Sequence, residues 1–346
     1  FGPGYIGSDN TNVEGLFNYF RGFCESTDEA AVIAMSAGVD QDMPGGAFLE
    51  ADRLVTTGQL SNDTLDRAVS NILIKKFAMR LFDLNGSAAI DPSTIKYLGS
   101  DQHRQLARET AQQSIVLLQN QPRQQGKEGK EKEPTATTAM LPFTGLRAGS
   151  KVALIGPFAD DEVAHLGTYY VPGAHCVTIK EALESRNFTV TTVQGSDAGR
   201  GGPTSPGSGQ DIKAAVAAIS ASDAAVIVVG TEACSCCTKC GNGEAGDRSD
   251  LDLEGHQLEL LSAVTKAAQE KGANFQWAVV LLHGRPVTFG PNQTEVLQNI
   301  PALLAAWRPG EEGGNAVVDL LVGDANPSAK LAQAWVQSAG FIGGPT

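Results

Sequence analysis

The chain has 346 residues, of which 42% are hydrophobic and 6% aromatic, and its formal net charge is −13. This length exceeds one compact core and suits about two domains. The composition is that of a soluble globular protein and excludes disorder as the dominant state. The negative charge argues against a nucleic-acid partner, which needs a basic face, and no apolar run approaches the roughly 20 residues that cross a bilayer.

The first residues, Phe1-Gly-Pro-Gly-Tyr5, contain neither an initiator Met nor a signal-peptide pattern, so we expect the chain to be part of a longer protein. Six cysteines and four N-x-S/T sequons favour a secreted or extracellular protein. The cysteine cluster Cys234-x-Cys-Cys-x-x-Cys240 fits local disulfides, with Cys24 or Cys176 as further partners, or a soft metal in a reducing compartment. Disulfides are the preferred interpretation. The sequons begin at Asn62, Asn85, Asn187 and Asn292.

The first 150 residues combine a short apolar segment with helical patterns. Gly4–Gly7 reads as a strand, and apolar spacings of three and four predict a helix over Leu60–Ile74 with Ser61 as its N-cap. A second helix is expected over Asp101–Gln119. Residues 121–139 are poor in apolar side chains and mixed in charge, which predicts a disordered insertion. We assign residues 1–85 to one domain, 86–150 to a linker with the first helix of the next domain, and 151–346 to a second domain.

From Lys151 strands and helices alternate, which predicts an α/β domain. Strands that are apolar on both faces and separated by helices indicate a mostly parallel sheet covered on two sides. The strands are expected at Val152–Ile155, Phe188–Val193, Ala224–Gly230, Trp277–Leu282 and Ala302–Trp307. The helices are expected at Ile179–Ser185, Asp211–Ser222, Glu254–Lys271 and Gly314–Val322.

Ligands of such sheets meet the loops at the carboxyl ends of the strands. Here those loops are residues 156–160, 232–252, 283–286 and 308–314. A nucleotide site is disfavoured because Gly156-Pro157, which follows the first predicted strand of this domain, opens neither a G-x-G-x-x-G nor a Walker-type phosphate motif.

Two carboxylates stand at candidate strand ends. Asp9 follows the short N-terminal strand, where it could be catalytic or could cap a helix. Glu244 lies among glycines in the loop 232–252, where it could be a mobile proton donor or a solvated side chain. A nucleophile and a proton donor held about 5 Å apart would suit glycoside hydrolysis with retention of configuration.

Several stretches, in order along the chain, resemble glycoside hydrolase family 3. They begin with Tyr5-Ile-Gly-Ser-Asp9 and Ala37-Gly-Val-Asp-Gln-Asp-Met-Pro-Gly-Gly46. The later ones are Gly58–Val69, Lys76–Asp83, Glu109–Asn120, Val152–Pro157, Glu244-x-x-Asp247-Arg248, Gly284-Arg-Pro286, Trp307–Ala316 and Gly323–Leu331.

This resemblance implies the end of a (β/α)8-type barrel followed by an (α/β)6 sandwich, with exo-acting hydrolysis of β-linked sugars and retention. It implies that Asp9 is the nucleophile and Glu244 the acid/base, with Glu232 as the alternative, while Asp247 and Arg248 pair with each other. The expected substrate is a β-linked oligosaccharide or an aryl or alkyl glycoside, most often a β-glucoside. No organic cofactor or metal is expected, because the two carboxylates carry the reaction.

The chain also departs from the family pattern. The family usually has Trp after the nucleophile, whereas this chain has Asn10, and most of the barrel upstream of Asp9 is expected to be missing. The stretch Gly167–Cys176 resembles relatives that act on β-xylosides, so a β-xylosidase is one alternative. A non-catalytic carbohydrate-binding or scaffold protein derived from the enzyme is the other.

Overall fold

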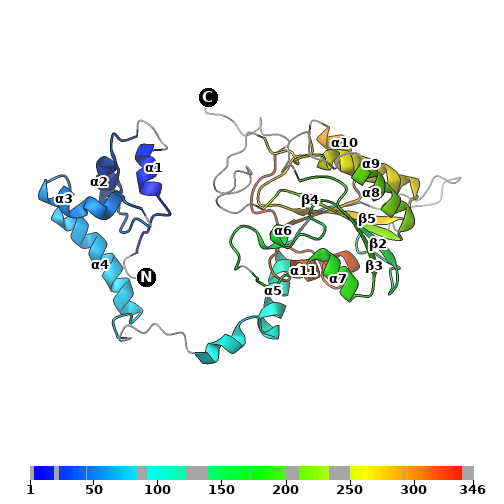
Figure 1. Ribbon diagram of the computed structural model, residues 1–346, viewed down its shortest axis with the longest axis horizontal. Coiled ribbons are helices and arrows are strands. Elements are labelled where there is room, and N and C mark those ends of the chain that lie inside the picture. Colours follow the sequence, from blue (N-terminus) through cyan, green and yellow to red (C-terminus); the bar gives the residue numbers. More distant parts are fainter. Residues whose placement is uncertain are drawn as a thin grey trace. The chain divides into compact units, whose positions relative to one another are not determined.

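A computed structural model divides the chain into two compact units, residues 1–95 and 96–346 (Figure 1). The 3₁₀ helix η2 (Pro92–Tyr97) lies at the boundary. Each unit is described by itself below. The structure describes residues 4–18, 23–43, 45–83, 92–121, 139–171, 173–198, 210–233, 250–290 and 292–336.

The first unit is helical over its described residues. It comprises α1 (Asn12–Asn18), α2 (Thr27–Ala37), η1 (Ala47–Glu50), α3 (Ala51–Thr56) and α4 (Asn62–Ala78). Its small core is built from apolar side chains of these helices, with Met35 and Leu54 among the most buried. The Ser61 side chain accepts a hydrogen bond from the Thr64 amide, which confirms the predicted N-cap of α4.

The segment Gly4–Gly7 is not a regular strand, contrary to the prediction from its apolar residues. Gly7 forms a single parallel bridge with Gln41, flanked by hydrogen bonds from the Ser8 amide to Gln41 O and from the Asp40 amide to Ile6 O. A strand needs a longer hydrogen-bonded ladder, and the described residues of this unit supply only this short pairing. The expected barrel end therefore stays a prediction.

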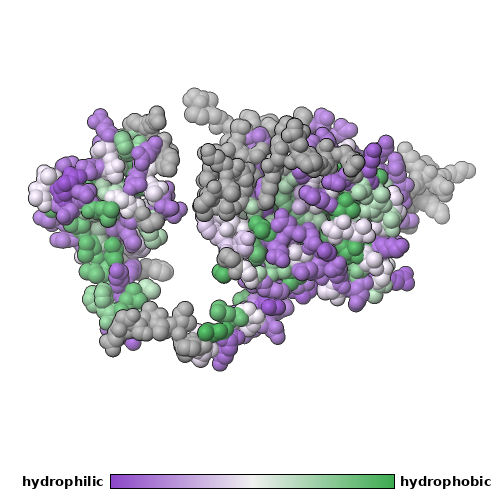
Figure 2. Space-filling model, in the orientation of Figure 1, coloured by the Kyte–Doolittle hydropathy of each residue, from purple (hydrophilic) through white to green (hydrophobic). Residues whose placement is uncertain are grey.

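Helix α4 has an exposed apolar stripe. Val69, Leu73 and Phe77 are spaced four residues apart and are 44%, 38% and 63% exposed, with Ile74 beside them at 45%. Figure 2 shows hydrophobic colour along this helix, whereas hydrophilic and hydrophobic colours are mixed over the described surface of the second unit in the same view. Contiguous exposed apolar side chains of this kind usually mark a contact surface.

The second unit contains a six-stranded sheet in the order β1-β6-β5-β4-β2-β3. All neighbouring pairs are parallel except β1 with β6, which is antiparallel. This confirms the predicted mostly parallel α/β sheet. The strands are β1 (Val116–Asn120), β2 (Lys151–Ile155), β3 (Thr189–Val193), β4 (Ala224–Gly230), β5 (Gln276–Leu282) and β6 (Ala302–Trp307).

Helices cover both faces of the sheet and bury a separate apolar cluster on each (Figure 1). One face packs on α5 (Asp101–Ser114), α6 (Glu162–Leu166), α7 (Ile179–Ser185) and α11 (Gly313–Val322). The other packs on α8 (Gln210–Ala221), α9 (Gln257–Glu270) and α10 (Gln293–Asn299). Because β4 and β5 are buried along their whole length, they form the centre of the unit.

The helix predicted over Asp101–Gln119 is too long. Helix α5 ends at Ser114, and the next residues form β1, which pairs with β6 and so closes one edge of the sheet. The run Ile115-Val-Leu-Leu118 is apolar at consecutive positions and begins with two β-branched residues, which favours a strand once a partner edge is present. The short helices α6 and α10 were not expected either.

A buried carboxylate ties three helices together on one face of the sheet. Asp319 of α11 accepts hydrogen bonds from Arg108 and Gln112 of α5 and from Arg186, which follows α7. Its side chain is only 1% exposed. Because these partners lie far away in the sequence, this cluster fixes α5 and α7 against α11.

Two segments with sequence predictions lie largely outside the described residues. The predicted insertion and the cysteines at 234–240 lie outside them, apart from the ends of the insertion at Gln121 and Ala139. Cys24 and Cys176 have free, buried thiols, so neither joins the cluster through a disulfide in this structure. Among the helices that the structure describes, none is long and apolar enough to cross a membrane.

Candidate active site

Asp9 lies where the paired segment of the first unit turns into α1. Its Oδ1 accepts a hydrogen bond of 2.8 Å from the Asn10 amide, and its backbone oxygen accepts one of 3.2 Å from the Asn12 amide. The side chain is exposed. A carboxylate held by one backbone amide keeps further lone pairs for a ligand. The residue after it, Asn10, is exposed.

The loop that resembles the family motif at residues 37–46 lies directly beside Asp9. The Ser8 hydroxyl donates to Asp42 Oδ1 at 2.9 Å, and Asp42 Oδ2 accepts from the Ala47 amide at 3.1 Å. Asp40 is buried, and its carboxylate accepts from the Ile6 amide at 3.0 Å and from Asn71 of α4 at 3.1 Å. Two stretches that were singled out separately in the sequence are therefore brought together, and their contacts fix the chain just before Asp9.

Of the two acid/base candidates, only Glu232 lies among the residues that the structure describes. Glu244, together with Asp247 and Arg248, lies outside the described residues. Glu232 lies two residues after the end of β4 and is 5% exposed. A buried carboxylate at this position is held by the protein interior and offers little surface to a substrate.

The carboxyl ends of β2, β4, β5 and β6 meet at one edge of the sheet, as their parallel order requires. Arg308, which follows β6, donates hydrogen bonds to Ala164 O in α6 and to Thr231 O after β4. The Gly284 amide, which follows β5, donates to Thr231 Oγ1 at 3.2 Å. The described residues at these strand ends, Arg308, Gly284 and Thr231, therefore lie together at one edge, as the sequence predicted.

A group of aromatic side chains lies at the same edge. The ring of His283 lies 4.6 Å from that of Trp307 and 5.2 Å from that of Trp335, measured between centroids. His283 Nδ1 donates to Arg285 O at 2.8 Å, and burial lowers the pKa of His283 to about 4, so the ring is neutral. Burial also lowers the pKa of His165, which is fully buried.

The sequence reasoning missed Arg308 and Trp307 as individual residues, although it selected their loop. Trp307 has a backbone φ of 57°, which is uncommon for a bulky residue. The sequence feature that could have pointed to them is an aromatic residue followed by an arginine at the carboxyl end of a buried strand. The role of this pair depends on the backbone conformation at Trp307, which cannot be read from the sequence.

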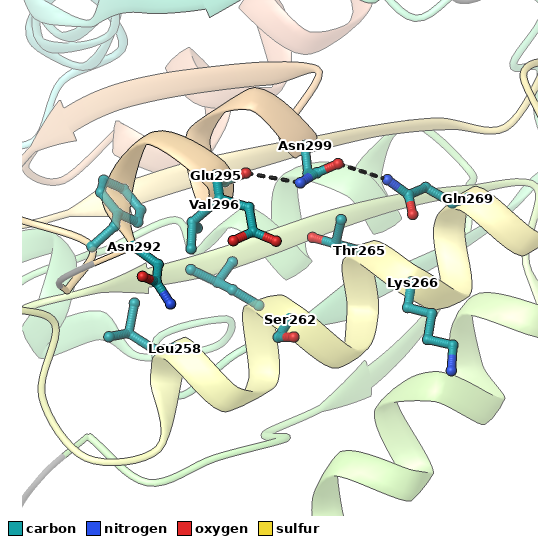
Figure 3. A pocket seen from close by; sticks show the side chains of 11 residues that line it. Leu258, Ser262, Thr265, Lys266, Gln269, Asn292, Glu295, Val296 and Asn299 are labelled. Atoms are coloured by element: carbon teal, nitrogen blue, oxygen red, sulfur yellow. Dashed lines mark hydrogen bonds between the residues drawn. The ribbon is translucent and has the colours of Figure 1, made fainter.

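A groove of about 570 Å³ lies between α9 and α10, away from these loops. Figure 3 shows Glu295 and Asn299 of α10 facing Thr265 and Gln269 of α9 across it. Among the described residues that line this groove, only Glu295 carries a carboxylate. Because retaining glycoside hydrolysis needs two carboxylates, this groove does not fit the predicted chemistry.

The architecture defines an α/β sandwich, preceded along the chain by a helical unit that carries Asp9. Residues 115–344 match the model of the glycosyl hydrolase family 3 C-terminal domain. The chain therefore belongs to glycosyl hydrolase family 3.

Individual relatives agree with this assignment. The chain is 31% identical to a β-xylosidase of Formosa agariphila over 98% of its own length and 43% of the relative, and 27% identical to a periplasmic β-glucosidase of Salmonella typhimurium over 97% and 42%. It resembles the structure of a β-glucosidase from Listeria innocua with a TM-score of 0.75 and 28% identity, over 98% of this chain and 42% of that one. The chain thus spans less than half the length of these relatives.

Proposed function

We propose that the protein is a retaining exo-acting β-glycosidase that hydrolyses terminal β-D-glucosyl residues. The observation that carries this proposal is the position of Asp9, exposed to solvent beside the 37–46 loop and held through Oδ1 by a single backbone amide. Membership of glycosyl hydrolase family 3 supports it.

In the proposed reaction, the Asp9 carboxylate attacks the anomeric carbon while Glu244 gives its proton to the departing glycosidic oxygen. The bond from carbon to the leaving oxygen breaks as the bond to Asp9 forms. Glu244, now ionised, then takes a proton from water, whose oxygen displaces Asp9 and releases the sugar with its original configuration.

Glu244 is preferred over Glu232 for physical reasons. A general acid must come within hydrogen-bond reach of the glycosidic oxygen. Glu232, at 5% exposure, is packed at the sheet edge directly after Thr231, whose amide is bonded to Leu282 O at 3.0 Å. This burial supports a structural role for Glu232.

β-D-Xylosyl residues are the second candidate substrate. Formosa agariphila and Arabidopsis thaliana relatives at 31% and 30% identity are β-xylosidases, whereas the Listeria innocua and Erythrobacter marinus structures are β-glucosidases. Comparing kcat/KM for 4-nitrophenyl β-glucoside and 4-nitrophenyl β-xyloside decides between the two sugars.

The test of the function is labelling with 2,4-dinitrophenyl 2-deoxy-2-fluoro-β-glucoside, and with the corresponding xyloside, followed by peptide mass spectrometry. It is done on this chain and on any longer form of the protein. We expect an adduct on the peptide that contains Asp9, its loss in Asp9→Asn, and its retention in Asp63→Asn, an exposed control carboxylate in α4. Sugar binding without any adduct, unchanged in Asp9→Asn, would instead support the non-catalytic carbohydrate-binding alternative.

We also propose that the protein is secreted. Three of its sequons begin at exposed residues: Asn62 at the start of α4, Asn187 before β3 and Asn292 before α10. Such positions are accessible to a glycan. Deglycosylation of protein from its natural source should reduce its mass, and an unchanged mass at all sequon peptides would count against this location.

A further inference from the structure

The loop 37–46 has no part in the proposed reaction, yet it binds the residue that precedes Asp9. The Ser8 hydroxyl donates a hydrogen bond of 2.9 Å to Asp42 Oδ1. Asp42 Oδ2 accepts one of 3.1 Å from the Ala47 amide, so both oxygens of this carboxylate are used. The Ser8 side chain is thereby tied to the start of η1.

The same loop also binds α1, the helix that follows Asp9. Glu14, in the first turn of this helix, accepts a hydrogen bond of 2.7 Å from the Gly46 amide. Between Asp9 and α1 the chain turns at Thr11, whose φ of 56° is uncommon for a β-branched residue. The Asp9 backbone oxygen accepts a hydrogen bond of 3.2 Å from the Asn12 amide in this turn. The loop therefore holds the chain on both sides of Asp9.

Two consecutive glycines of the loop leave the space that these carboxylates occupy. A Cβ at Gly45 would lie 2.1 Å from Asp42 Oδ2. A Cβ at Gly46 would lie 2.8 Å from Glu14 Oε1. Both distances are too short for a van der Waals contact, so a methyl group at either position would push the carboxylate away.

The backbone before Asp9 is held independently of the Ser8 side chain. The Ser8 amide donates to Gln41 O at 2.8 Å. The Ile6 amide donates at 3.0 Å to the carboxylate of Asp40, which is buried. Removal of the Ser8 hydroxyl leaves both of these bonds in place, so the variant should fold. What the hydroxyl adds is a fixed direction for the residue next to Asp9.

The carboxylate of Asp9 depends on this local backbone for its own direction. Of the hydrogen bonds among the described residues, one reaches it, the bond of 2.8 Å from the adjacent Asn10 amide. The side chain is otherwise exposed. A displacement of about 1 Å of a reacting group can cost about 100-fold in rate, so a small rotation of the Ser8 and Asn10 backbone should be measurable.

We propose that Ser8, Asp42 and Glu14 are positioning residues that direct the Asp9 carboxylate towards the anomeric carbon. This inference rests on the proposed function, in which Asp9 is the nucleophile. None of the three residues is assigned contact with the substrate.

Inactivation by 2,4-dinitrophenyl 2-deoxy-2-fluoro-β-glucoside measures this role. The bond from Asp9 to the anomeric carbon forms as the bond to dinitrophenolate breaks, and this leaving group needs no proton donor. The first-order rate constant ki reports this step in folded molecules, whereas Ki reports reversible binding. A loss of folded protein lowers the number of labelled molecules and leaves ki unchanged.

The experiment uses the intact chain and any longer form of the protein, with the corresponding xyloside if this is the better reagent. We expect Ser8→Ala to lower ki by about 10- to 100-fold and to change Ki by less than about 3-fold. Ser8→Thr keeps the hydroxyl and should recover part of the rate. Glu14→Ala should also lower ki, whereas Glu14→Gln keeps an acceptor oxygen for the Gly46 amide and should restore it.

Gly45→Ala tests the same contact without removing a polar group. Its methyl group should displace Asp42 from Ser8, so ki should fall by a factor similar to that in Ser8→Ala. Gly4→Ala is the matched control, because a Cβ at Gly4 has no atom within 4 Å among those considered. Ser70→Ala, at an exposed serine of α4, is the control for Ser8→Ala. Neither control should change ki.

The outcomes separate the two proposals. An unchanged ki in Ser8→Ala and Gly45→Ala, whether or not fewer molecules are labelled, would overturn the positioning role while leaving the glycosidase function intact. A wild-type protein that is not labelled at Asp9 by either reagent would overturn the role of Asp9 as nucleophile, and the positioning role with it.

Discussion

Removal of the Asp319 carboxylate should strongly destabilise the second unit. Asp319 accepts four hydrogen bonds from Arg108, Gln112 and Arg186, and the two arginine side chains are 31% and 19% exposed. These bonds raise the pKa of Arg108 above its usual value. Asp319→Ala would leave both guanidinium groups near each other without their shared counter-ion.

The magnitude follows from this geometry. Breaking a buried pair costs about 3–5 kcal/mol, and the partial exposure of both arginines places Asp319→Ala near the lower end, at about 3 kcal/mol. For a unit of this size that corresponds to a fall in Tm of about 6–12 °C. Arg108→Met should cost less, about 1–2 kcal/mol, because Arg186 and Gln112 still satisfy the carboxylate.

Thermal and urea unfolding followed by far-UV circular dichroism measure both variants. Asp324→Ala is the matched control, since Asp324 is exposed and lies 3.7 Å from Arg186. If Asp319→Ala unfolded within about 0.5 kcal/mol of wild type, the range of ordinary surface substitutions, the reasoning that this cluster fixes α5 and α7 against α11 would be wrong.

Three further predictions concern single residues. The pKa of His283 is about 4 in the folded state and about 6.5 unfolded, so its contribution to stability is present above pH 6.5 and lost as the pH falls towards 4, by up to about 3 kcal/mol. Urea unfolding across this range should therefore show a shallower pH dependence in His283→Asn, and equal slopes would contradict the assignment. The pKa of Cys176 is raised to about 12, first by burial, so native protein at pH 8 should resist iodoacetamide at Cys176 and react there only after unfolding, as peptide mass spectrometry would show. Gly156→Ala would place a Cβ 1.9 Å from Val228 O at a backbone φ of 131°, so we expect loss of more than about 3 kcal/mol of stability, whereas Gly149→Ala, with open space around its Cβ, should cost only its backbone strain.

Local patterns were sufficient to locate most elements of the second unit. The apolar runs at 224–230, 277–282 and 302–307 are long enough, and rich enough in branched side chains, to be buried strands in any arrangement. Their alternation with amphipathic helices leaves a parallel sheet as the compact solution, and that order brings the four loops to one edge. The N-cap at Ser61 was equally local, because a hydroxyl and a nearby amide suffice to form it.

Other features depended on tertiary contacts. The end of α5 at Ser114 was decided by the free edge of β6, which turned an apolar run into β1. The segment Gly4–Gly7 lacked a sufficiently long partner and formed only a bridge, although its residues would suit a strand.

The candidate site shows the same division. The sequence by itself determined which residue types were available: a carboxylate after the N-terminal segment, a second carboxylate in a glycine-rich loop, and loops at the ends of buried strands. Only the tertiary structure decided that Ser8 contacts Asp42, that Asp319 joins α5, α7 and α11, and that Arg308 holds Thr231. Each of these contacts joins residues that are distant along the chain, so each depends on how the chain folds and packs. A local sequence pattern predicts only the secondary structure of its own segment.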